Sequence, residues 1–170
     1  GNISQYVIKP YYSSSTAEIS NDSTLLIISG GRSIKIYNLL DGTTANYLEI
    51  DNPISDIALF HHSPKVLVGK GWDKDEGLVW DYFTGEIRIY ETDREYGYID
   101  PYSEVQVTAD DQFIRFRIYD DFYYTFNVET GSFITERMSL GATINPVKPE
   151  LANFGREGID IYIIDPETIE

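Results

Sequence analysis

The chain carries two histidines and no cysteine, so the side chains most often used as metal ligands and nucleophiles are scarce. His61 and His62 are adjacent. Adjacent side chains of a strand point to opposite faces, so a strand would not let both histidines bind one ion. Without cysteine the chain has no disulfide, thiolate metal site or cysteine nucleophile. We therefore predict that both histidines are ordinary residues at the end of a strand.

A second candidate for chemistry is the acidic segment Asp73-Lys74-Asp75-Glu76-Gly77. It begins like a calcium-binding loop, in which alternate carboxylates ligate the ion. Its fifth position is a glycine, however, and its twelfth is Thr84 in place of the glutamate that binds calcium through both oxygens. We therefore predict a solvated turn here, and further turns at Asp110-Asp111 and Asp120-Asp121.

The segment 91–104 mixes tyrosines with carboxylates and is much longer than its counterpart at 51–53. Loops on a rigid scaffold often carry function, and tyrosine gives contact area at a low cost in side-chain entropy. An acidic loop of this kind suits a partner that bears lysine or arginine; the alternative is that its tyrosines pack against neighbouring strands. The residues that we predict to bind the partner are Tyr96, Tyr98, Tyr102, Asp93, Glu95 and Asp100.

Composition limits the classes of partner. The 170 residues include 13 lysines and arginines against 28 aspartates and glutamates, a formal net charge of −15. This charge opposes binding to nucleic-acid backbones and anionic membranes, so we predict neither as a partner. No apolar run approaches the ~20 residues of a membrane-spanning helix. The balance of apolar and charged residues predicts a single folded domain over 1–170, and the lack of cysteine fits a reducing cytosol without requiring one.

Short strands are predicted to position these candidate residues. Apolar residues occur in runs of about four to eight separated by Gly, Pro, Asp, Asn and Ser, which is the pattern of many short strands. Helical spacing is almost absent. The segments 33–38 and 86–91 alternate strictly between apolar and polar residues, which predicts one packed and one wetter face. Strands are predicted at 6–8, 25–29, 34–39, 47–50, 54–60, 66–69, 78–82, 87–90, 105–108, 113–118, 123–128, 133–137 and 159–164.

An internal repeat of roughly 40 residues organises these strands. Tyr37-Asn38-Leu39-Leu40-Asp41-Gly42 aligns with Trp80-Asp81-Tyr82-Phe83-Thr84-Gly85 and with Phe126-Asn127-Val128-Glu129-Thr130-Gly131. A fourth copy, Ile164-Asp165-Pro166-Glu167-Thr168, lacks the glycine. Two apolar strands precede each copy, and the glycine turn leads into a more polar strand. Four strands in a repeat of this length predict the blade of a β-propeller.

The repeats resemble those of the WD-repeat propeller family. The segment 54–60 followed by Ser63-Pro64 resembles the inner strand of the family and the turn after it, and Trp80-Asp81 matches the dipeptide that names the family. The resemblance extends over about 16–168. Only one copy carries Trp-Asp and none carries the Gly-His dipeptide of the family, so its buried His-Asp-Ser-Trp network is incomplete in every copy, although Ser29 and Trp80 stand where members of that network would fall.

We therefore predict an all-β domain, a propeller-type array of about four four-stranded antiparallel blades at about 16–50, 54–92, 103–138 and 141–170. An open array leaves bare strand edges, and three solutions remain open. The chain forms part of a larger propeller, it assembles with itself or another chain, or it closes as a four-bladed ring. In the last case residues 5–9 supply the missing outer strand of the final blade.

The function that these features predict is a non-catalytic protein–protein interaction scaffold, without a cofactor, which presents acidic, tyrosine-rich loops to a partner with a basic surface. One alternative is a ligand-binding or hydrolytic propeller in which carboxylates around the central axis bind calcium. A second alternative is a purely structural role, in which the chain completes a larger propeller or complex.

Overall fold

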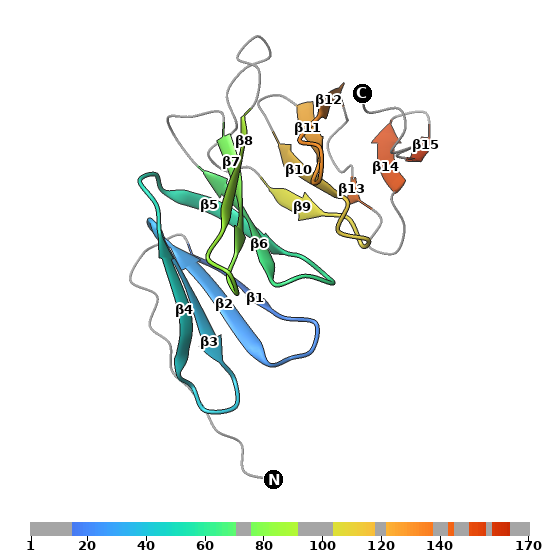
Figure 1. Cartoon of the computed structure of the whole chain (residues 1–170). Coiled ribbons are helices and arrows are strands. Elements are labelled where there is room, and N and C mark those ends of the chain that lie inside the picture. The colour runs from blue at the N-terminus through green and yellow to red at the C-terminus, as the bar shows by residue number, and fades with distance from the viewer. Residues whose placement is uncertain are drawn as a thin grey trace.

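The computed structural model describes residues 15–70, 76–91, 104–117, 122–137, 143–144, 150–155 and 158–163. All fifteen regular elements in these ranges are β-strands, so the prediction of an all-β chain is confirmed. They form four antiparallel sheets, each built from strands that are consecutive in the sequence (Figure 1).

Within each sheet every strand pairs with the next strand along the chain. Sheet 1 consists of β1 (Ser15–Ile19), β2 (Leu25–Gly30), β3 (Ser33–Asn38) and β4 (Thr44–Glu49). Sheet 2 consists of β5 (Ile54–Leu59), β6 (Lys65–Lys70), β7 (Glu76–Asp81) and β8 (Ile87–Glu91). Sheet 3 consists of β9 (Val105–Val107), β10 (Phe113–Arg117), β11 (Phe122–Asn127) and β12 (Phe133–Arg137). Sheet 4 has three strands among the described residues, β13 (Thr143–Ile144), β14 (Glu150–Gly155) and β15 (Gly158–Ile163).

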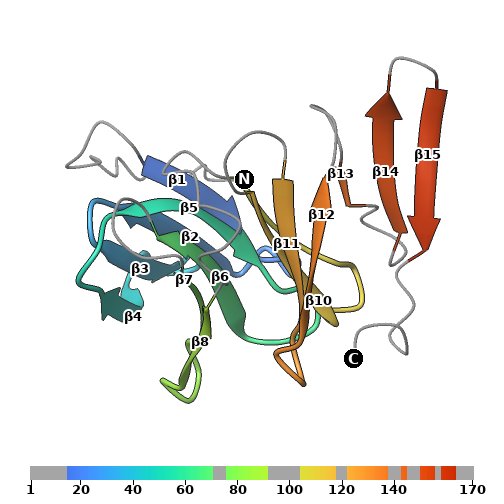
Figure 2. The same cartoon turned by 90° about the horizontal axis from the view of Figure 1, so that it is seen from above.

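Sheets 1, 2 and 3 lie side by side, with their first strands adjoining one another. Strand β1 contacts β5, and β5 in turn contacts β9 (Figure 2). We call β1, β5 and β9 the inner strands. The fourth strands, β4, β8 and β12, end each sheet on the opposite edge and are called the outer strands.

Two apolar cores hold these three sheets together. The alternation of side chains lets β5, β6 and β7 of sheet 2 contribute apolar residues to both faces, one toward sheet 1 and one toward sheet 3. The core between sheets 1 and 2 contains Ile27, Ile34, Ile36, Ile54, Ile57, Val66, Val68, Leu78 and Trp80. The core between sheets 2 and 3 contains Ala58, Phe60, Leu67, Val79, Tyr90, Val105, Val107, Ile114, Phe116, Tyr124 and Phe126.

The repeated motif forms the turn between the third and fourth strands of sheets 1 to 3. The Asn or Asp of the motif stabilises this turn, because its side-chain oxygen accepts a hydrogen bond from the backbone N–H two residues later. These bonds run to Asn38 from Leu40 (2.8 Å), to Asp81 from Phe83 (3.0 Å) and to Asn127 from Glu129 (2.9 Å). The motif glycines Gly42, Gly85 and Gly131 have φ angles of 71°, 82° and 76°, which glycine adopts without steric cost.

Candidate functional site

The predicted partner-binding residues Tyr96, Tyr98, Tyr102, Asp93, Glu95 and Asp100 lie outside the described residues. So do the predicted closing strand at 5–9, the pair Asp120-Asp121 and residues 71–75 of the acidic segment. The candidate site is therefore built from the turns and strand edges of sheets 1 to 3.

Six turns of sheets 1 to 3 gather at one end of the array, because antiparallel strands bring the first and third turns of a sheet to the same end. Backbone hydrogen bonds join these two turns in every sheet. They run from Leu39 N to Thr24 O (2.8 Å), from Tyr82 N to Pro64 O (3.0 Å) and from Val128 N to Gln112 O (2.8 Å). We call this end the turn face; its turns span 20–24, 38–43, 60–64, 81–86, 108–112 and 127–132.

Asp111 joins the first turns of sheets 2 and 3. Its carboxylate accepts hydrogen bonds from the backbone N–H groups of His61 (2.6 Å) and His62 (2.7 Å), and from the hydroxyl of Ser63 (3.2 Å). On the other side of the same turn, the amide nitrogen of Asn21 donates to the carbonyl oxygen of His61 (3.2 Å). The two histidines thus follow β5 in a turn, and their backbone groups connect three sheets.

The outer strands make a second set of connections between sheets. Asn46 in β4 donates from its side-chain amide to the carbonyl oxygen of Tyr82 in sheet 2. Arg88 in β8 donates to the carbonyl oxygens of Val128 (2.6 Å) and Glu129 (2.8 Å) in sheet 3. At both junctions, therefore, a polar side chain of one sheet binds the third turn of the next sheet.

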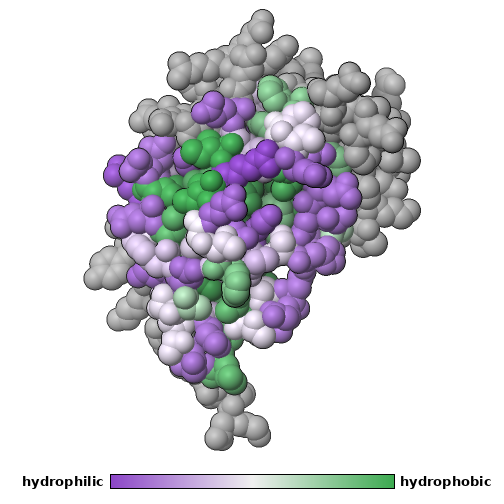
Figure 3. All heavy atoms as spheres, viewed as in Figure 1, coloured by the Kyte–Doolittle hydropathy of each residue, from purple (hydrophilic) through white to green (hydrophobic). Residues whose placement is uncertain are grey.

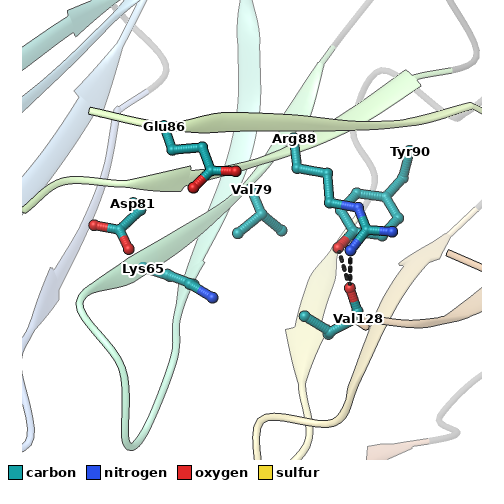
Figure 4. Close-up of a pocket in the computed structure, with 7 residues that line it drawn as sticks. All are labelled: Lys65, Val79, Asp81, Glu86, Arg88, Tyr90 and Val128. Carbon is teal, nitrogen blue, oxygen red and sulfur yellow. Dashed lines mark hydrogen bonds between the residues drawn. The ribbon is translucent and has the colours of Figure 1, made fainter. Parts of the chain in front are cut away.

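A small pocket of about 120 Å³ lies beside these connections, between sheets 2 and 3 (Figure 4). Arg88 and Tyr90 both point at the Val128 carbonyl, and the Tyr90 hydroxyl donates to it at 2.8 Å (Figure 4). Lys65 and Glu86 also line the pocket. Its volume is well below the roughly 300 Å³ at which ligand pockets begin. The guanidinium of Arg88 is hydrogen-bonded to backbone carbonyl oxygens of sheet 3, so the residues around the pocket join the two sheets.

Two carboxylates on the inner strands join sheets in the same manner. Glu18 accepts a hydrogen bond from Leu59 N (2.9 Å), and Asp56 accepts one from Val105 N (3.2 Å). Burial raises the pKa of both carboxyl groups, against the opposing effect of these hydrogen bonds. The Asp56 carboxylate further raises the pKa of Glu18. Within the described ranges no group of three or more histidine or acidic side chains is placed to hold a metal ion.

Large apolar side chains are exposed mainly on the outer hairpins of sheets 1 and 2. Figure 3 shows apolar patches set among hydrophilic side chains on the face that carries these hairpins. The exposed fractions are 90% for Leu40, 85% for Phe83, 51% for Ile89, 47% for Tyr47 and 44% for Ile87. Leu40 and Phe83 occupy the same position of the repeated motif, at the tips of neighbouring turns.

Sequence reasoning missed this pair of tip residues, although the aligned motif contained a signal. The fourth motif position holds Leu40 and Phe83 in two copies and Glu129 in the third. A position that tolerates glutamate in the same turn does not need an apolar side chain for folding. The exposed leucine and phenylalanine there are therefore available for contact with another molecule.

Carboxylates surround the two tip residues. Hydrogen bonds from the hydroxyl groups of Ser20 and Thr24 hold the pKa of Asp22 below its ordinary value, and those from the Thr43 hydroxyl and backbone N–H do the same for Asp41. At Asp81, partial burial opposes this effect, but N–H donors from Thr84 and Phe83 and the Lys65 charge keep the pKa low. The turn face is therefore anionic.

No protein-family model matches the chain, and no curated protein matches it. In the part of the chain that the structure describes, there is no helix with the length and apolar character needed to cross a membrane.

Proposed function

We propose that this chain is a non-catalytic protein–protein interaction scaffold, a propeller-type array whose turn face binds a partner protein. Leu40 and Phe83 are the apolar anchors of the contact, and the surrounding carboxylates orient a partner that bears lysine or arginine.

The observation that carries the proposal is the exposure of Phe83 on a turn that hydrogen bonds hold to its own sheet and to sheet 1. The Asp81 side chain accepts hydrogen bonds within the turn, from Phe83 N (3.0 Å) and Thr84 N (2.9 Å). Tyr82 is bonded through its N–H to Pro64 and through its carbonyl oxygen to Asn46 of sheet 1. An aromatic side chain presented on such a turn loses little conformational entropy when it binds, which favours recognition.

A propeller-type arrangement is supported by the repetition of the contacts between sheets. Sheets 1 and 2, and sheets 2 and 3, are each joined by an inner-strand carboxylate, by their first turns and by an outer-strand side chain. Contacts that repeat from one sheet to the next are what a propeller requires, because each blade meets its neighbour in the same way. In such an arrangement the hydrogen-bonded turns of successive sheets form one continuous turn face.

A peptide selection tests the proposal. The whole chain is immobilised, a random peptide library displayed on phage is selected against it at physiological salt, and the selected peptides are titrated against variants. We expect peptides rich in lysine or arginine with one or more large apolar residues. Their affinity should fall by about tenfold or more for the Leu40→Ser, Phe83→Ser double variant, because both anchors are lost.

The matched control is Tyr47→Ser, since Tyr47 is also an exposed aromatic residue of an outer hairpin but lies on β4, away from the turn tips. This variant should bind the selected peptides as the unaltered chain does. Peptides that bind the double variant with full affinity, or a selection that yields no peptide dependent on either anchor, would overturn the proposal.

A further inference from the structure

The outer strand of sheet 2, β8, presents an open edge. It pairs with β7 on one side, and no strand among the described residues pairs with its other side. The backbone N–H and C=O groups along such an edge are free to pair with an added strand. Natural sheets usually protect edges with bulges, prolines or charges, so the character of this edge is informative.

The side chains of β8 extend an apolar row from the core to the edge. Ile87 pairs with Trp80 and Ile89 pairs with Leu78, and both partners are only 2% exposed. The two isoleucines are themselves 44% and 51% exposed on the same face of the strand. An added strand with apolar residues in register would cover them and continue both rows.

The equivalent edge of sheet 1 is built differently. The pairing of β3 with β4 is interrupted by a register shift between Ile36 and Tyr37, whereas β7 and β8 pair without a shift. Thr44 pairs with Tyr37, in the place that Ile87 takes beside Trp80. A bulge discourages edge pairing, so β4 has one form of protection that β8 lacks.

Charge selects the kind of strand that β8 can accept. Glu91 ends the strand on the face of Ile87 and Ile89, Glu86 precedes it on the opposite face beside Arg88, and both side chains are exposed. The one cation of the strand, Arg88, donates to carbonyl oxygens of sheet 3. An added strand therefore meets a carboxylate at each end and, on one face between them, the two isoleucines. The net charge of −15 on each chain opposes pairing of two β8 edges with one another.

Strand β8 is also held in place before anything binds. Arg88 and Tyr90 on its other face donate to the Val128 carbonyl oxygen of sheet 3, at 2.6 and 2.8 Å. A partner therefore meets an ordered template and does not bear the cost of ordering it.

We propose that the β8 edge binds an extended segment of a partner protein by adding a strand to sheet 2, with alternating apolar residues over Ile87 and Ile89 and a lysine or arginine at each end. The inference rests on the proposed scaffold function and deepens it, because it gives the conformation and chemistry of one partner segment. Backbone hydrogen bonds supply affinity in this mode, and the alternating side chains supply specificity.

A synthetic peptide provides the test: acetyl-Lys-Lys-Val-Thr-Val-Thr-Val-Lys-Lys-amide, titrated into the whole chain and followed by amide hydrogen exchange. We expect slowed exchange in 87–91 and no change in 44–49, the equivalent strand of sheet 1. The affinity should fall by about tenfold for the Ile87→Thr, Ile89→Thr double variant, because threonine keeps the strand preference and removes the apolar contact.

Two controls isolate the elements of recognition. Tyr47→Thr changes a side chain of similar exposure on β4 and should leave binding of the peptide unchanged. A peptide with glutamate in place of every lysine should not bind. Two further peptides each carry N-methyl groups on one of the two alternate sets of backbone nitrogens. Only the peptide methylated on the set whose N–H groups pair with β8 should lose binding. Loss of binding on both N-methylated sets, or on neither, contradicts strand addition.

The outcomes separate this inference from the proposed function. If the peptide binds but slows exchange only in the turn face, and its affinity depends on Leu40 and Phe83 alone, the scaffold stands and strand addition at β8 is wrong. If neither surface binds any peptide, both proposals fail. A dimer in light scattering that the isoleucine double variant abolishes would make a second copy of the chain the occupant of the edge, which also overturns the inference.

Discussion

Asn46 and Arg88 occupy the same position in successive sheets, and each donates a hydrogen bond to the next sheet. Asn46 pairs with Ile36, and Arg88 pairs with Val79, which is the repeat equivalent of Ile36. Each side chain donates to the carbonyl oxygen of the third motif residue in the next sheet, although one is an amide and the other a guanidinium. The geometry of the sheets, and not the identity of the donor, is what repeats.

Substitution of these donors should loosen the outer contacts between sheets. We expect Arg88→Ala to lower the free energy of unfolding by about 1 kcal/mol, because two hydrogen bonds to sheet 3 are lost from an exposed side chain. Asn46→Ala should have a similar effect at the other junction. Urea unfolding followed by tryptophan fluorescence measures both. Lys35→Ala, an exposed residue of β3, is the control and should change stability by less than about 0.5 kcal/mol; an equal loss for all three variants would contradict the expectation.

Asp111 should prove important for the junction of the first turns. Asp111→Ala removes the acceptor of three hydrogen bonds and places alanine at a φ of 61°, so we expect a loss of about 2 kcal/mol in thermal or urea unfolding. Asp111→Asn keeps an oxygen acceptor and tolerates the left-handed backbone, and should lose less. Asp111→Gly also lacks the acceptor, but glycine adopts the left-handed backbone without strain. A glycine variant as stable as the unaltered chain would show that the bonds contribute nothing.

Local rules explain which parts of the fold could be predicted from the sequence. The third turns were predicted, because an Asn or Asp with a glycine four residues later favours a specific turn without reference to the rest of the molecule. Strand β1 was missed because its five residues, STAEI, carry little apolar pattern. The same holds for β14, whose sequence ELANFG has neither β-branched residues nor regular alternation.

The contacts that define the candidate site depend on tertiary structure and could not be predicted in this way. Asp111, Glu18 and Asn46 all pair with backbone groups of other sheets, and such partners leave no trace in the residue types. Arg115 is a further example. It lies fully buried at the position that Ile27 and Leu67 take in sheets 1 and 2, with its guanidinium 3.6 Å from the ring centre of Tyr123. Alternation alone would predict an apolar residue there.

Gly77 should tolerate no side chain, because sheet 3 approaches its backbone closely. A Cβ at this position would overlap the ring of Phe116, which is fully buried between sheets 2 and 3. We expect Gly77→Ala to cost at least about 2 kcal/mol in urea unfolding. Combining it with Phe116→Leu, which shortens the ring side chain, should recover part of that loss. Gly85→Ala meets nothing within 4 Å but has a φ of 82°, so its cost of about 1 kcal/mol reflects backbone strain alone. Equal costs at both glycines would contradict the close approach of Phe116.

The dependence of stability on pH should differ in sign between the buried and exposed carboxylates. Burial raises the pKa of Glu18 above its ordinary value of 4.5, so the folded state binds this proton more tightly than the unfolded state. The resulting stabilisation is present below pH 4.5 and is lost as the pH rises through the folded pKa. Glu18→Gln keeps an oxygen for Leu59 N–H but cannot ionise. Its stability relative to the unaltered chain should therefore increase from pH 4 to pH 7.

Asp41→Asn is the matched control for Glu18→Gln, since it removes one negative charge from the same chain. Hydrogen bonds from Thr43 lower the pKa of Asp41 below 3.8, so its contribution is present above pH 3.8 and is lost as the pH falls through the folded pKa. The stability of this variant relative to the unaltered chain should therefore decrease as the pH rises toward 3.8 and then stay nearly constant over the higher range in which that of Glu18→Gln increases. Melting temperatures of the three proteins measured from pH 3 to pH 7 provide the comparison. Parallel curves for the two variants would mean that only net charge matters and that the Glu18 contact between β1 and β5 does not control this dependence.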